Sequence, residues 1–466
     1  MRASIRNLGP VREADISIRP LTILIGKNNT GKTWTAYLAA AALSRFGLDR
    51  FLEAYIHKRF SYDEVDGVLE RVAEDGSASI DLLKFLDANG SRFLNDLASL
   101  APEWMGEFLG TEGEGFHDLQ LHLDPQDTMD KWKENVRDRV TMGGLRIGPK
   151  DLGLRARKDK NKSAMEFYTI DRDSESDLLT SETVRSFVAE GIFLALHRSI
   201  FPKVVFLPPE RIAYAALALS MPYNVNAKED TQHPGARPVR LSYPIRDFIG
   251  MLVWVKNRDR AELERRIKLS EKNRSISNCL DAAKILETLL GGEIRLVSSE
   301  ASSDLKEKKV VFLPEGSGKT LEITATASLV KALSPLYLYL KYLAEPGDLL
   351  VIDEPEMNLH PEAQAKITEL LSLLANSGIS VIATTHSPYI TDHLINIMKA
   401  AEMERKEAMA ERFYLKTSAS FISRENVSVY RFEDGTAVNA LSEDGMIDAG
   451  TFGDVSDRVS QLYFEL

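Results

Sequence analysis

The sequence predicts an α/β fold with large, mostly helical insertions, and three stretches of the chain support this prediction. Residues 26–33 read GKNNTGKT, between an apolar run at 21–25 and a helix-compatible segment at 34–46 that ends at Gly47. Residues 347–388 alternate a buried strand, a helix and a second buried strand. Residues 2–25 read as short strands, because apolar and polar residues alternate there. We therefore expect antiparallel strands at the N-terminus, followed by parallel strands that alternate with helices.

The stretch 26–33 fits the phosphate-binding P-loop pattern at every fixed position. Its glycines let the backbone wrap around a phosphate, and the N-terminus of the following helix adds partial positive charge. Lys32 would reach the β- and γ-phosphates of a nucleotide, and the Thr33 hydroxyl would ligate Mg²⁺. A chance match is the alternative, and the strand before the loop and the helix after it argue against it. The predicted nucleotide-binding residues are Gly26, Asn28, Asn29, Thr30, Gly31, Lys32 and Thr33.

The bulk properties of the chain narrow its class. Its 466 residues, 44% of them apolar, predict a domain with large insertions or two domains, each with ample core material. The single cysteine, Cys279, excludes an internal disulfide and is typical of a reducing, cytoplasmic environment. No apolar run approaches the roughly 20 residues that span a bilayer, so we expect no membrane span. The net charge of −11 disfavours blanket nucleic-acid binding and leaves room for a local basic face.

Residues 48–200 lack the strand–helix alternation and read as a mostly helical insertion. Within it, 131–162 holds eleven Lys or Arg against four acids, a local net charge of +7. The densest part, 155–162, reads as an exposed loop. A solvated hairpin explains this charge as well as a contact with a nucleic-acid backbone or a partner protein does. No aromatic residues are interleaved with the charges, which disfavours a platform for single-stranded nucleic acid.

Residues 201–212 are expected to return the chain to the fold that holds the P-loop. A strand-like run at 203–207 is followed by the sequence PPER. Glu210 or Arg211 would then lie near the nucleotide. The alternative is a helix N-terminus that carries surface charges.

Residues 213–292 read as a loop at 222–244 and then a second helical insertion. Beyond them, the sequence EGSGKT at 315–320 imitates a second P-loop. Leu313 stands where the first glycine should be, and a strand-like segment follows where a helix should begin. The stretch therefore predicts a hairpin turn between two strands.

Two strands further along the chain bring charged residues toward the P-loop. One ends in Asp353 and Glu354, and the next delivers His386. Because a helix joins them, the strands should be parallel, with their carboxyl ends at the edge where the P-loop lies. Asp353 would hold Mg²⁺ together with Thr33, Glu354 would act as general base on the attacking water, and His386 would donate to the γ-phosphate. With Lys32, Glu354 and His386 are the predicted catalytic residues for hydrolysis.

The sequence DEPEMNLHP at 353–361 resembles the Walker B motif and D-loop of ABC-type ATPases, and THSP at 385–388 resembles their switch histidine. The residues of these two motifs are most similar to those of the RecF/OLD-like branch, where OLD denotes the overcoming-lysogenisation-defect nucleases. Similar heads occur in ATPase components of bacterial anti-phage systems such as PARIS and Septu. The resemblance covers about 1–47 and 293–400. It implies an ABC-type P-loop NTPase head that binds ATP and Mg²⁺ between two heads, so that the chain forms a homodimer or a higher oligomer.

In that family a signature segment of the second head contacts the γ-phosphate. The sequence ASLVK at 327–331 matches its place, and Ser328 would supply the hydroxyl, although Leu329 stands where the family has glycine. The family's glutamine loop is not evident, because neither Gln120 nor Gln126 has its context.

The OLD nucleases continue into a TOPRIM domain, a nuclease module that needs an Asp-x-Asp pair. After His386 the sequence has no such pair. The resemblance therefore implies an ATPase without a TOPRIM domain, whose nucleotide state controls assembly with or release of a separate effector, a nuclease or toxin in anti-phage defence. The alternative is a RecF/SMC-like ATPase of DNA repair or maintenance that binds DNA through 131–162. A transporter ATPase is disfavoured because the Leu-Ser-Gly-Gly-Gln signature is missing, and a P-loop kinase because the adjacent carboxylates suit water attack better.

These signals divide the chain into six segments. They are the N-terminal lobe of the head with the P-loop at 1–47, a helical insertion at 48–200, a return to the head at 201–212, a loop and second helical insertion at 213–292, the head with the signature-like segment, Walker B motif and switch histidine at 293–400, and C-terminal strands with a tail at 401–466.

Overall fold

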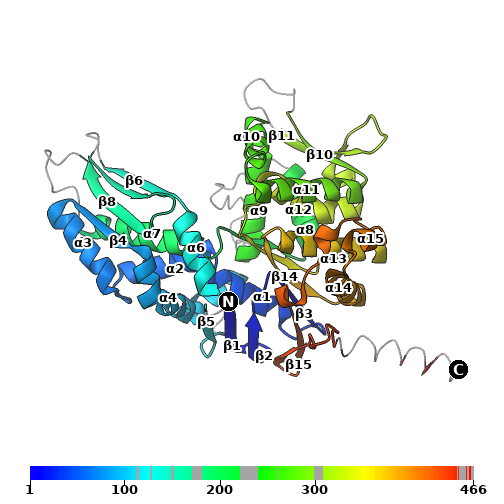
Figure 1. Ribbon diagram of the computed structural model, residues 1–466, viewed down its shortest axis with the longest axis horizontal. Helices are drawn as coiled ribbons and strands as arrows, with labels where there is room; N and C mark the ends of the chain where they lie inside the picture. The colour runs from blue at the N-terminus through cyan, green and yellow to red at the C-terminus, as the bar shows by residue number, and fades with distance from the viewer. Residues whose placement is uncertain are drawn as a thin grey trace, which may run out of the picture. The chain divides into compact units, whose positions relative to one another are not determined.

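The computed structural model describes the chain except for residues 112–114, 126–127, 148–151, 171–180, 221–239, 259, 299–307, 449, 451–457, 459–460 and 463–466. The chain divides into two compact units, which are coloured by residue number in Figure 1. The small unit comprises Met1–Asn7, Leu38–Trp104 and His117–Val204. The large unit comprises Leu8–Tyr37, Met105–Phe116 and Val205–Leu466.

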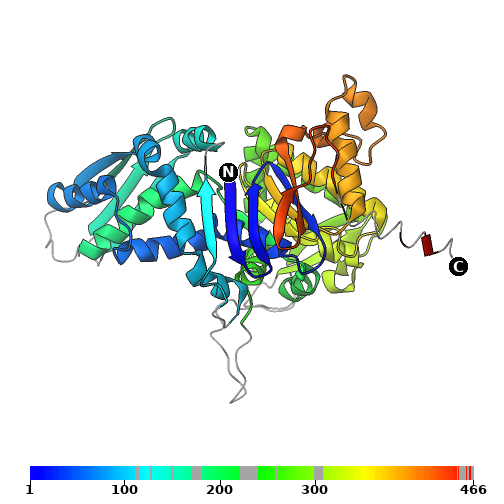
Figure 2. The same ribbon diagram turned by 90° about the horizontal axis from the view of Figure 1, so that it is seen from below.

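The large unit is built on a mixed sheet. Its strands follow in the order β2 (Val11–Ser17), β16 (Thr436–Asn439), β15 (Val427–Glu433), β3 (Leu21–Gly26), β14 (Ser380–Thr385), β13 (Leu349–Asp353) and β9 (Val204–Leu207). β3 is parallel to both of its neighbours, β15 and β14, and β14 is also parallel to β13. Figure 2 shows the late strands (orange to red) beside the early ones (blue), where β16 pairs with β2. The continuous apolar runs of β3 and β13 suit these positions, because a central parallel strand is buried on both faces.

Helices of the large unit pack on this sheet and on one another. They are α1 (Lys32–Ala42, in this unit to Tyr37), α5 (Ala101–Leu109, from Met105), α8 (Arg211–Ser220), α9 (Tyr243–Lys256), α10 (Arg260–Ser270), α11 (Arg274–Leu290), α12 (Ser328–Tyr342), α13 (Pro361–Asn376), α14 (Pro388–Ala401), α15 (Lys406–Ala410) and the short helices η3 (Ile323–Ala325), η4 (Ser418–Ser420) and η5 (Arg424–Asn426). α12 packs on α8 and α11, and α11 also packs on α13 (Figure 1). Their apolar faces enclose the main core together with β3, β13 and β14. A second sheet in the order β10 (Gly292–Ser298), β11 (Lys308–Pro314) and β12 (Leu321–Glu322) precedes α12 in the chain.

The small unit combines helices with a four-stranded antiparallel sheet. The sheet has the order β4 (Ser77–Asp81), β8 (Ala164–Ile170), β7 (Leu152–Lys158) and β6 (Thr141–Ile147). The remaining elements are β1 (Arg2–Leu8), which pairs antiparallel with β5 (Gln120–Asp124), and the helices α2 (Arg45–Ile56), α3 (Asp63–Asp75), α4 (Leu82–Ser99), α6 (Met129–Asp138) and α7 (Ser181–Arg198). One face of the sheet is covered by α7, where Phe187 meets Phe167 edge-on. The ring of Phe193, also on α7, packs against Phe51 and Phe93 at centroid distances of 4.9 and 5.3 Å and joins α2 and α4 to it.

Several sequence predictions are confirmed by these elements. The N-terminal strands, the strand at 204–207, the helix at 361–376 and the strands near 427–433 and 436–439 all form where the sequence places them. The imitation P-loop is a connection between antiparallel strands, since Val311 pairs with Glu322 and Phe312 with Leu321.

Two predictions are wrong. The helix after the P-loop ends at Ala42, and Gly47 lies inside α2, where a β-carbon would come within 2.6 Å of the Ala42 carbonyl oxygen. The stretch 155–158 is part of β7 and not an exposed loop, because Leu154, Ala156 and Lys158 alternate inward. The insertion at 48–200 is mostly helical, as predicted, and also contains a four-stranded sheet. The loop at 222–244, Gln126 and the tail beyond 450 lie wholly or largely outside the described residues.

Candidate active site

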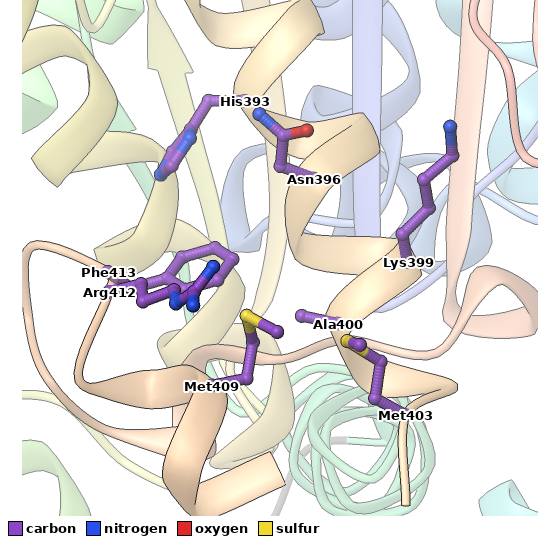
Figure 3. Close-up of a pocket in the computed structure, with 8 residues that line it drawn as sticks. All are labelled: His393, Asn396, Lys399, Ala400, Met403, Met409, Arg412 and Phe413. Carbon is purple, nitrogen blue, oxygen red and sulfur yellow. The ribbon is translucent and has the colours of Figure 1, made fainter. Parts of the chain in front are cut away.

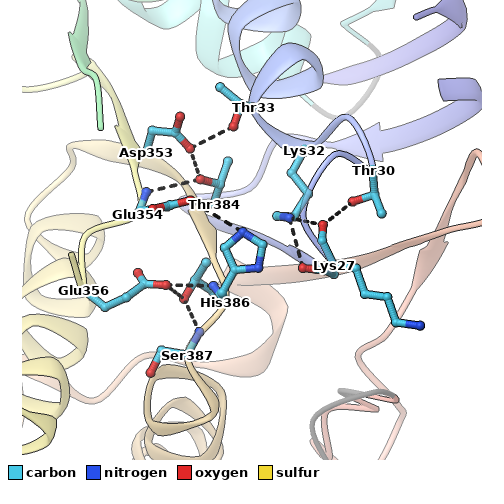
Figure 4. A network of polar contacts seen from close by, with 12 residues as sticks. Lys27, Thr30, Lys32, Thr33, Asp353, Glu354, Glu356, Thr384, His386 and Ser387 are labelled. Carbon is cyan, nitrogen blue, oxygen red and sulfur yellow. Dashed lines mark hydrogen bonds and ion pairs between the residues drawn. The ribbon is translucent and has the colours of Figure 1, made fainter. Parts of the chain in front are cut away.

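Three segments that are distant in sequence end at the same edge of the large unit's sheet. The parallel register pairs Asp353 with Thr384, and Thr385 with Ile25, so β13, β14 and β3 finish side by side. The P-loop follows β3, Glu354 follows β13 and His386 follows β14 (Figure 4). The structure therefore brings together the P-loop and the charged residues that the sequence places near it.

The backbone of the loop requires glycine at both of its ends. Gly26 has φ of +140°, and a β-carbon there would lie 2.6 Å from the Phe432 carbonyl oxygen. Gly31 has φ of +94°, and a β-carbon there would meet Val11 at 2.2 Å. Asn29 adopts the left-handed region with φ of +62°, which asparagine tolerates better than most residues. These conformations fold the loop tightly in front of α1.

Lys32 is buried inside this loop. Its Nζ donates to the carbonyl oxygens of Gly26 at 3.0 Å and Lys27 at 2.6 Å (Figure 4). Burial lowers the pKa of Lys32 to about 8, although the nearby carboxylates of Asp353, Glu354 and Glu356 oppose that shift. The ammonium group thus lies beside three acids with no carboxylate partner of its own among the described residues. It is suited to receive an anion.

Asp353 and Thr33 lie together at the start of α1. The Thr33 hydroxyl donates to Asp353 Oδ1 at 3.0 Å, and the Thr384 hydroxyl contacts the same oxygen. Burial raises the pKa of Asp353 to about 6, although these two hydrogen bonds act against the shift. An oxygen pair of carboxylate and hydroxyl is the donor set that Mg²⁺ takes from a protein when substrate oxygens and water complete its shell. The residues present therefore fit a magnesium ion.

Glu354 and His386 face each other across the same site. His386 Nε2 lies 3.5 Å from Glu354 Oε1, and both side chains are about one-third exposed, at 28% and 34%. Burial and the positive charge of Lys32 lower the pKa of His386, so the imidazole is held neutral at neutral pH. Glu354 is a carboxylate at the rim of the site, which a water molecule can reach.

The remaining predicted residues lie at the surface of the large unit. Asn28 and Asn29 are exposed at the tip of the loop, and the Thr30 hydroxyl donates to the Lys27 carbonyl at 2.9 Å. Ser328 is exposed at the first position of α12. No hydrogen bond between described residues joins Ser328 to the P-loop, so the structure does not bring this residue into the site.

Two residues of the site were missed in the sequence. Glu356 is largely buried, and its Oε1 accepts from the Thr385 hydroxyl and from the His386 backbone N–H, both at 2.7 Å. Thr384 supports Asp353 and also accepts from the Glu354 backbone N–H at 3.2 Å. A signal for both was available, since Glu356 lies within DEPE and Thr384 ends the strand before His386.

For Arg211 the sequence left two alternatives open, a position near the nucleotide or a surface charge at a helix N-terminus. It is fully buried at the start of α8 and donates to the Asp353 and Glu354 carbonyl oxygens, both at 2.7 Å, so it is no surface charge. Glu210, by contrast, is exposed. The return segment does end at the site, through its arginine.

A separate hollow of about 290 Å³ lies between α14 and α15 (Figure 3). Its lining residues are His393, Asn396, Lys399, Ala400, Met403, Met409, Arg412 and Phe413. None of the predicted site residues lines it. The His393 side chain in this lining already has a partner, because its Nε2 lies 2.8 Å from the buried carboxylate of Glu369.

The described part of the chain offers neither a membrane span nor a cluster of metal ligands. No helix there is long and apolar enough to cross a membrane. Within the same residues, no group of three or more His, Cys, Asp or Glu is placed to hold a metal ion.

Residues 215–392 match a family model described as "AAA domain, putative AbiEii toxin, Type IV TA system". This segment begins in α8 and includes Asp353, Glu354 and His386. This segment lies in the large unit, makes up less than half of the chain and is similar to a domain of AAA type. No curated protein matches the sequence.

Solved structures similar to the chain include two SMC head domains and the recombination mediator RecF. An Smc head domain from Pyrococcus furiosus, with an extended coiled coil and bound to the C-terminal domain of ScpA, has a TM-score of 0.35 and 12% identity over 99% of this chain and 98% of that chain. An SMC head domain from Thermotoga maritima has a TM-score of 0.30 and 10% identity over 94% and 97%. The recombination mediator RecF has a TM-score of 0.29 and 9% identity over 94% and 97%.

Proposed function

We propose that this protein hydrolyses ATP to ADP and phosphate with Mg²⁺, at the edge where β3, β13 and β14 end. The observation that carries the proposal is the convergence of Lys32, Asp353, Glu354 and His386 on one P-loop. Phosphate binding alone would require the loop and Lys32. The neighbouring carboxylate and imidazole add the groups that hydrolysis needs.

Each residue has a separate task in this proposal. Lys32 exchanges its hydrogen bonds to the Gly26 and Lys27 carbonyls for phosphate oxygens. Thr33 and Asp353 hold Mg²⁺, which neutralises charge on the phosphates when bound. Glu354 accepts a proton from the attacking water. His386, held neutral, donates from Nε2 to the γ-phosphate and so responds to its presence.

We further propose that two copies of the chain enclose the nucleotide and that the closed assembly controls a separate effector, a nuclease or toxin, in anti-phage defence. Ser328 supports the first part, because it is exposed at the N-terminus of α12 and lies outside the P-loop site of its own chain. The matching family model, which is itself described as a putative AbiEii toxin of a Type IV toxin–antitoxin system, supports a role within such a system, while the separate effector rests on the family resemblance alone. The buried, free Cys279 fits a cytoplasmic protein.

Steady-state ATP hydrolysis and oligomeric state test the proposal together. Glu354→Gln should lower kcat by about 10²–10⁴-fold, because it removes the general base, while ATP binding persists. With ATP the variant should accumulate as a closed dimer or larger species in light scattering. Glu362→Gln, at an exposed position of α13 near the site, should behave as the wild type. Absence of Mg²⁺-dependent hydrolysis in the wild type, or an active Glu354→Gln variant, would contradict the proposal.

Nucleic-acid binding through 131–162 remains a second candidate function, and the small unit's sheet favours it. Arg155 and Arg157 lie on the face of β7 opposite α7, and Arg155 pairs directly with Tyr168 across the strands. Met142 of β6, which pairs with Arg157 of β7, is 74% exposed. The face also carries Glu166 opposite Arg157, and Arg157 pairs with Asp159 at 2.8 Å, so Arg155 beside Tyr168 is the combination that suits a single strand, contrary to what the sequence suggested.

Salt-dependent binding tests this candidate. The double variant Arg155→Ala, Arg157→Ala should weaken binding of a single-stranded oligonucleotide and reduce the salt slope by about one to two charges. Arg92→Ala is the control, because Arg92 is a comparably exposed arginine on α4, away from that face. Binding that is absent, or insensitive to salt, would remove the candidate. Lys158 is buried and therefore cannot contribute its charge to this face.

A further inference from the structure

Arg211 is a fully buried cation that the proposed chemistry leaves unused. Its Nη1 donates to the Asp353 carbonyl at 2.7 Å and to the Pro208 carbonyl at 3.3 Å, and its Nη2 donates to the Glu354 carbonyl at 2.7 Å. Among the described residues it forms no ion pair, and its Nε has no partner. A buried guanidinium ordinarily pairs with a carboxylate. Here its two Nη atoms donate to two successive backbone carbonyls instead.

The backbone that Arg211 holds has an unusual conformation. Glu354 has φ of +47°, in the left-handed region that residues other than glycine rarely adopt. Such a conformation costs on the order of 1–3 kcal/mol and persists only where the surroundings enforce it. On the amino side, the Glu354 N–H donates to the Thr384 carbonyl at 3.1 Å and hydroxyl at 3.2 Å. On the carboxyl side, the Glu354 carbonyl accepts from Arg211 Nη2 at 2.7 Å and from the Met357 N–H at 3.1 Å, so Arg211 supplies the shorter of these two hydrogen bonds.

Arg211 is itself fixed by packing. It is the first residue of α8, whose Ala215, Ala218 and Leu219 are buried in the main core. α8 packs on α12 and on η3, the short helix before Ser328. The guanidinium therefore projects from a rigid element, and its position relative to β13 is set by the core of the large unit.

We propose that Arg211 is a positioning residue, which holds the peptide of Glu354 in its left-handed turn so that the Glu354 carboxylate faces the attacking water. This inference rests on the hydrolytic function proposed above and assigns Arg211 no contact with ATP. Without the guanidinium, the Asp353 carbonyl loses its Nη1 donor and the Glu354 carbonyl keeps only the bond from the Met357 N–H at 3.1 Å, so Glu354 is held less firmly and can relax to an ordinary φ. The carboxylate would then leave the site, while Lys32, Thr33 and the P-loop would stay in place.

The test compares Arg211 with Arg266, a partly buried arginine of the same large unit that also donates to backbone carbonyls. Arg266 Nη2 contacts the carbonyl oxygens of Leu340 and Ala344, at the end of α12, and its Nε is likewise unpartnered. Arg211→Met should lower kcat at least about 30-fold while the dissociation constant for ATP changes less than about threefold. Arg211→Lys should recover part of kcat, because an ammonium can satisfy one carbonyl but cannot reproduce the planar fork. Arg266→Met and Arg266→Lys should lower the melting temperature without that selective loss of kcat.

The outcomes separate this inference from the function on which it depends. A wild-type protein that hydrolyses ATP, beside an Arg211→Met variant that does so equally well, would overturn the role of Arg211 alone. A wild type without hydrolysis would overturn the proposed function itself. If Arg211→Met does not fold, a crystal structure of Arg211→Lys decides. A Glu354 peptide that has turned away from its left-handed conformation supports the inference, and an unchanged peptide together with wild-type kcat contradicts it.

Discussion

The two units of this protein each contain a buried lysine whose ammonium donates to backbone carbonyls. In the large unit Lys32 is 5% exposed and bonds to two carbonyls of its own loop. In the small unit Lys158 is 1% exposed and bonds to the Arg137, Arg139 and Asp159 carbonyls at 3.1, 2.6 and 3.2 Å. Burial lowers the pKa of both ammonium groups.

The surroundings of the two lysines differ, and this difference distinguishes a lysine that can bind a ligand from one that stabilises the fold. Three donors and three carbonyls satisfy Lys158 completely, and these carbonyls join the end of α6 to the turn after β7. Lys32 has two carbonyl partners and lies in the field of three carboxylates. Its partners also belong to the segment that would wrap a phosphate. A satisfied ammonium holds a fold together, whereas an ammonium with exchangeable partners can meet a ligand.

The largest expected effect separates these two lysines. Lys32→Ala should weaken ATP binding more than about 100-fold, because the charge that meets the phosphates is lost. Lys158→Met should lower the free energy of unfolding by about 1–3 kcal/mol, since it removes the ammonium donor from three carbonyls, of which those of Arg137 and Asp159 keep bonds from the Asn161 and Lys162 N–H groups. It should change ATP affinity less than about twofold. Calorimetric titration with ATP and thermal unfolding of both variants measure the two effects. Equal loss of ATP affinity in both variants would show that the contrast is mistaken.

A smaller effect concerns the acid beside Lys32. Because the pKa of Asp353 in the folded chain is raised to about 6, above its ordinary value of 3.8, its charge opposes folding once the pH exceeds the folded pKa. The penalty is on the order of 3 kcal/mol above pH 6 and declines as the pH falls through 6 toward 4. Asp353→Asn should therefore raise the melting temperature of the nucleotide-free protein at pH 8, while it abolishes Mg²⁺-dependent hydrolysis.

Glu369→Gln is the matched control for that substitution, with the opposite sign. The Glu369 carboxylate is buried in the same unit, but it accepts from His393, from the Tyr414 N–H at 3.0 Å and from the Leu415 N–H at 2.8 Å. An amide there cannot accept both backbone bonds at separate oxygens, so the melting temperature should fall. If Asp353→Asn also lowers the melting temperature at pH 8, the charge of Asp353 is compensated in the folded chain.

The large unit could be predicted from sequence where its signals are local. The P-loop is one contiguous pattern, and β13 and β14 are unbroken apolar runs that end in polar residues. Parallel pairing of these strands then follows from the helix between them, and it places Asp353, Glu354 and His386 together. The role of Arg211 could not be found in this way, because its contact with Asp353 joins positions 142 residues apart.

The small unit was harder to predict, because charged residues interrupt the alternation of apolar and polar residues in one of its strands. In β7 the sequence LGLRARK alternates as a strand should, but Lys158 occupies an inward position where an apolar residue is expected. Its charge is tolerated only because three carbonyls from other segments surround it. The same contacts turn an apparent basic loop into a strand, and they are visible only in three dimensions.

The smallest expected effect concerns the number of protons taken up or released when ATP and Mg²⁺ bind. This number should change sign between pH 6 and pH 8. Mg²⁺ favours the ionised form of Asp353, whose pKa is about 6, so binding at pH 6 should release protons. The phosphates favour the charged form of Lys32, whose pKa is about 8, so binding at pH 8 should take up about half a proton. Titration calorimetry in buffers of different ionisation enthalpy measures both arms. Asp353→Asn should remove the release at pH 6 and keep the uptake at pH 8. Uptake that is missing at pH 8 in the wild type would mean that Lys32 is already fully charged, and that its burial in the loop does not prepare it for the anion.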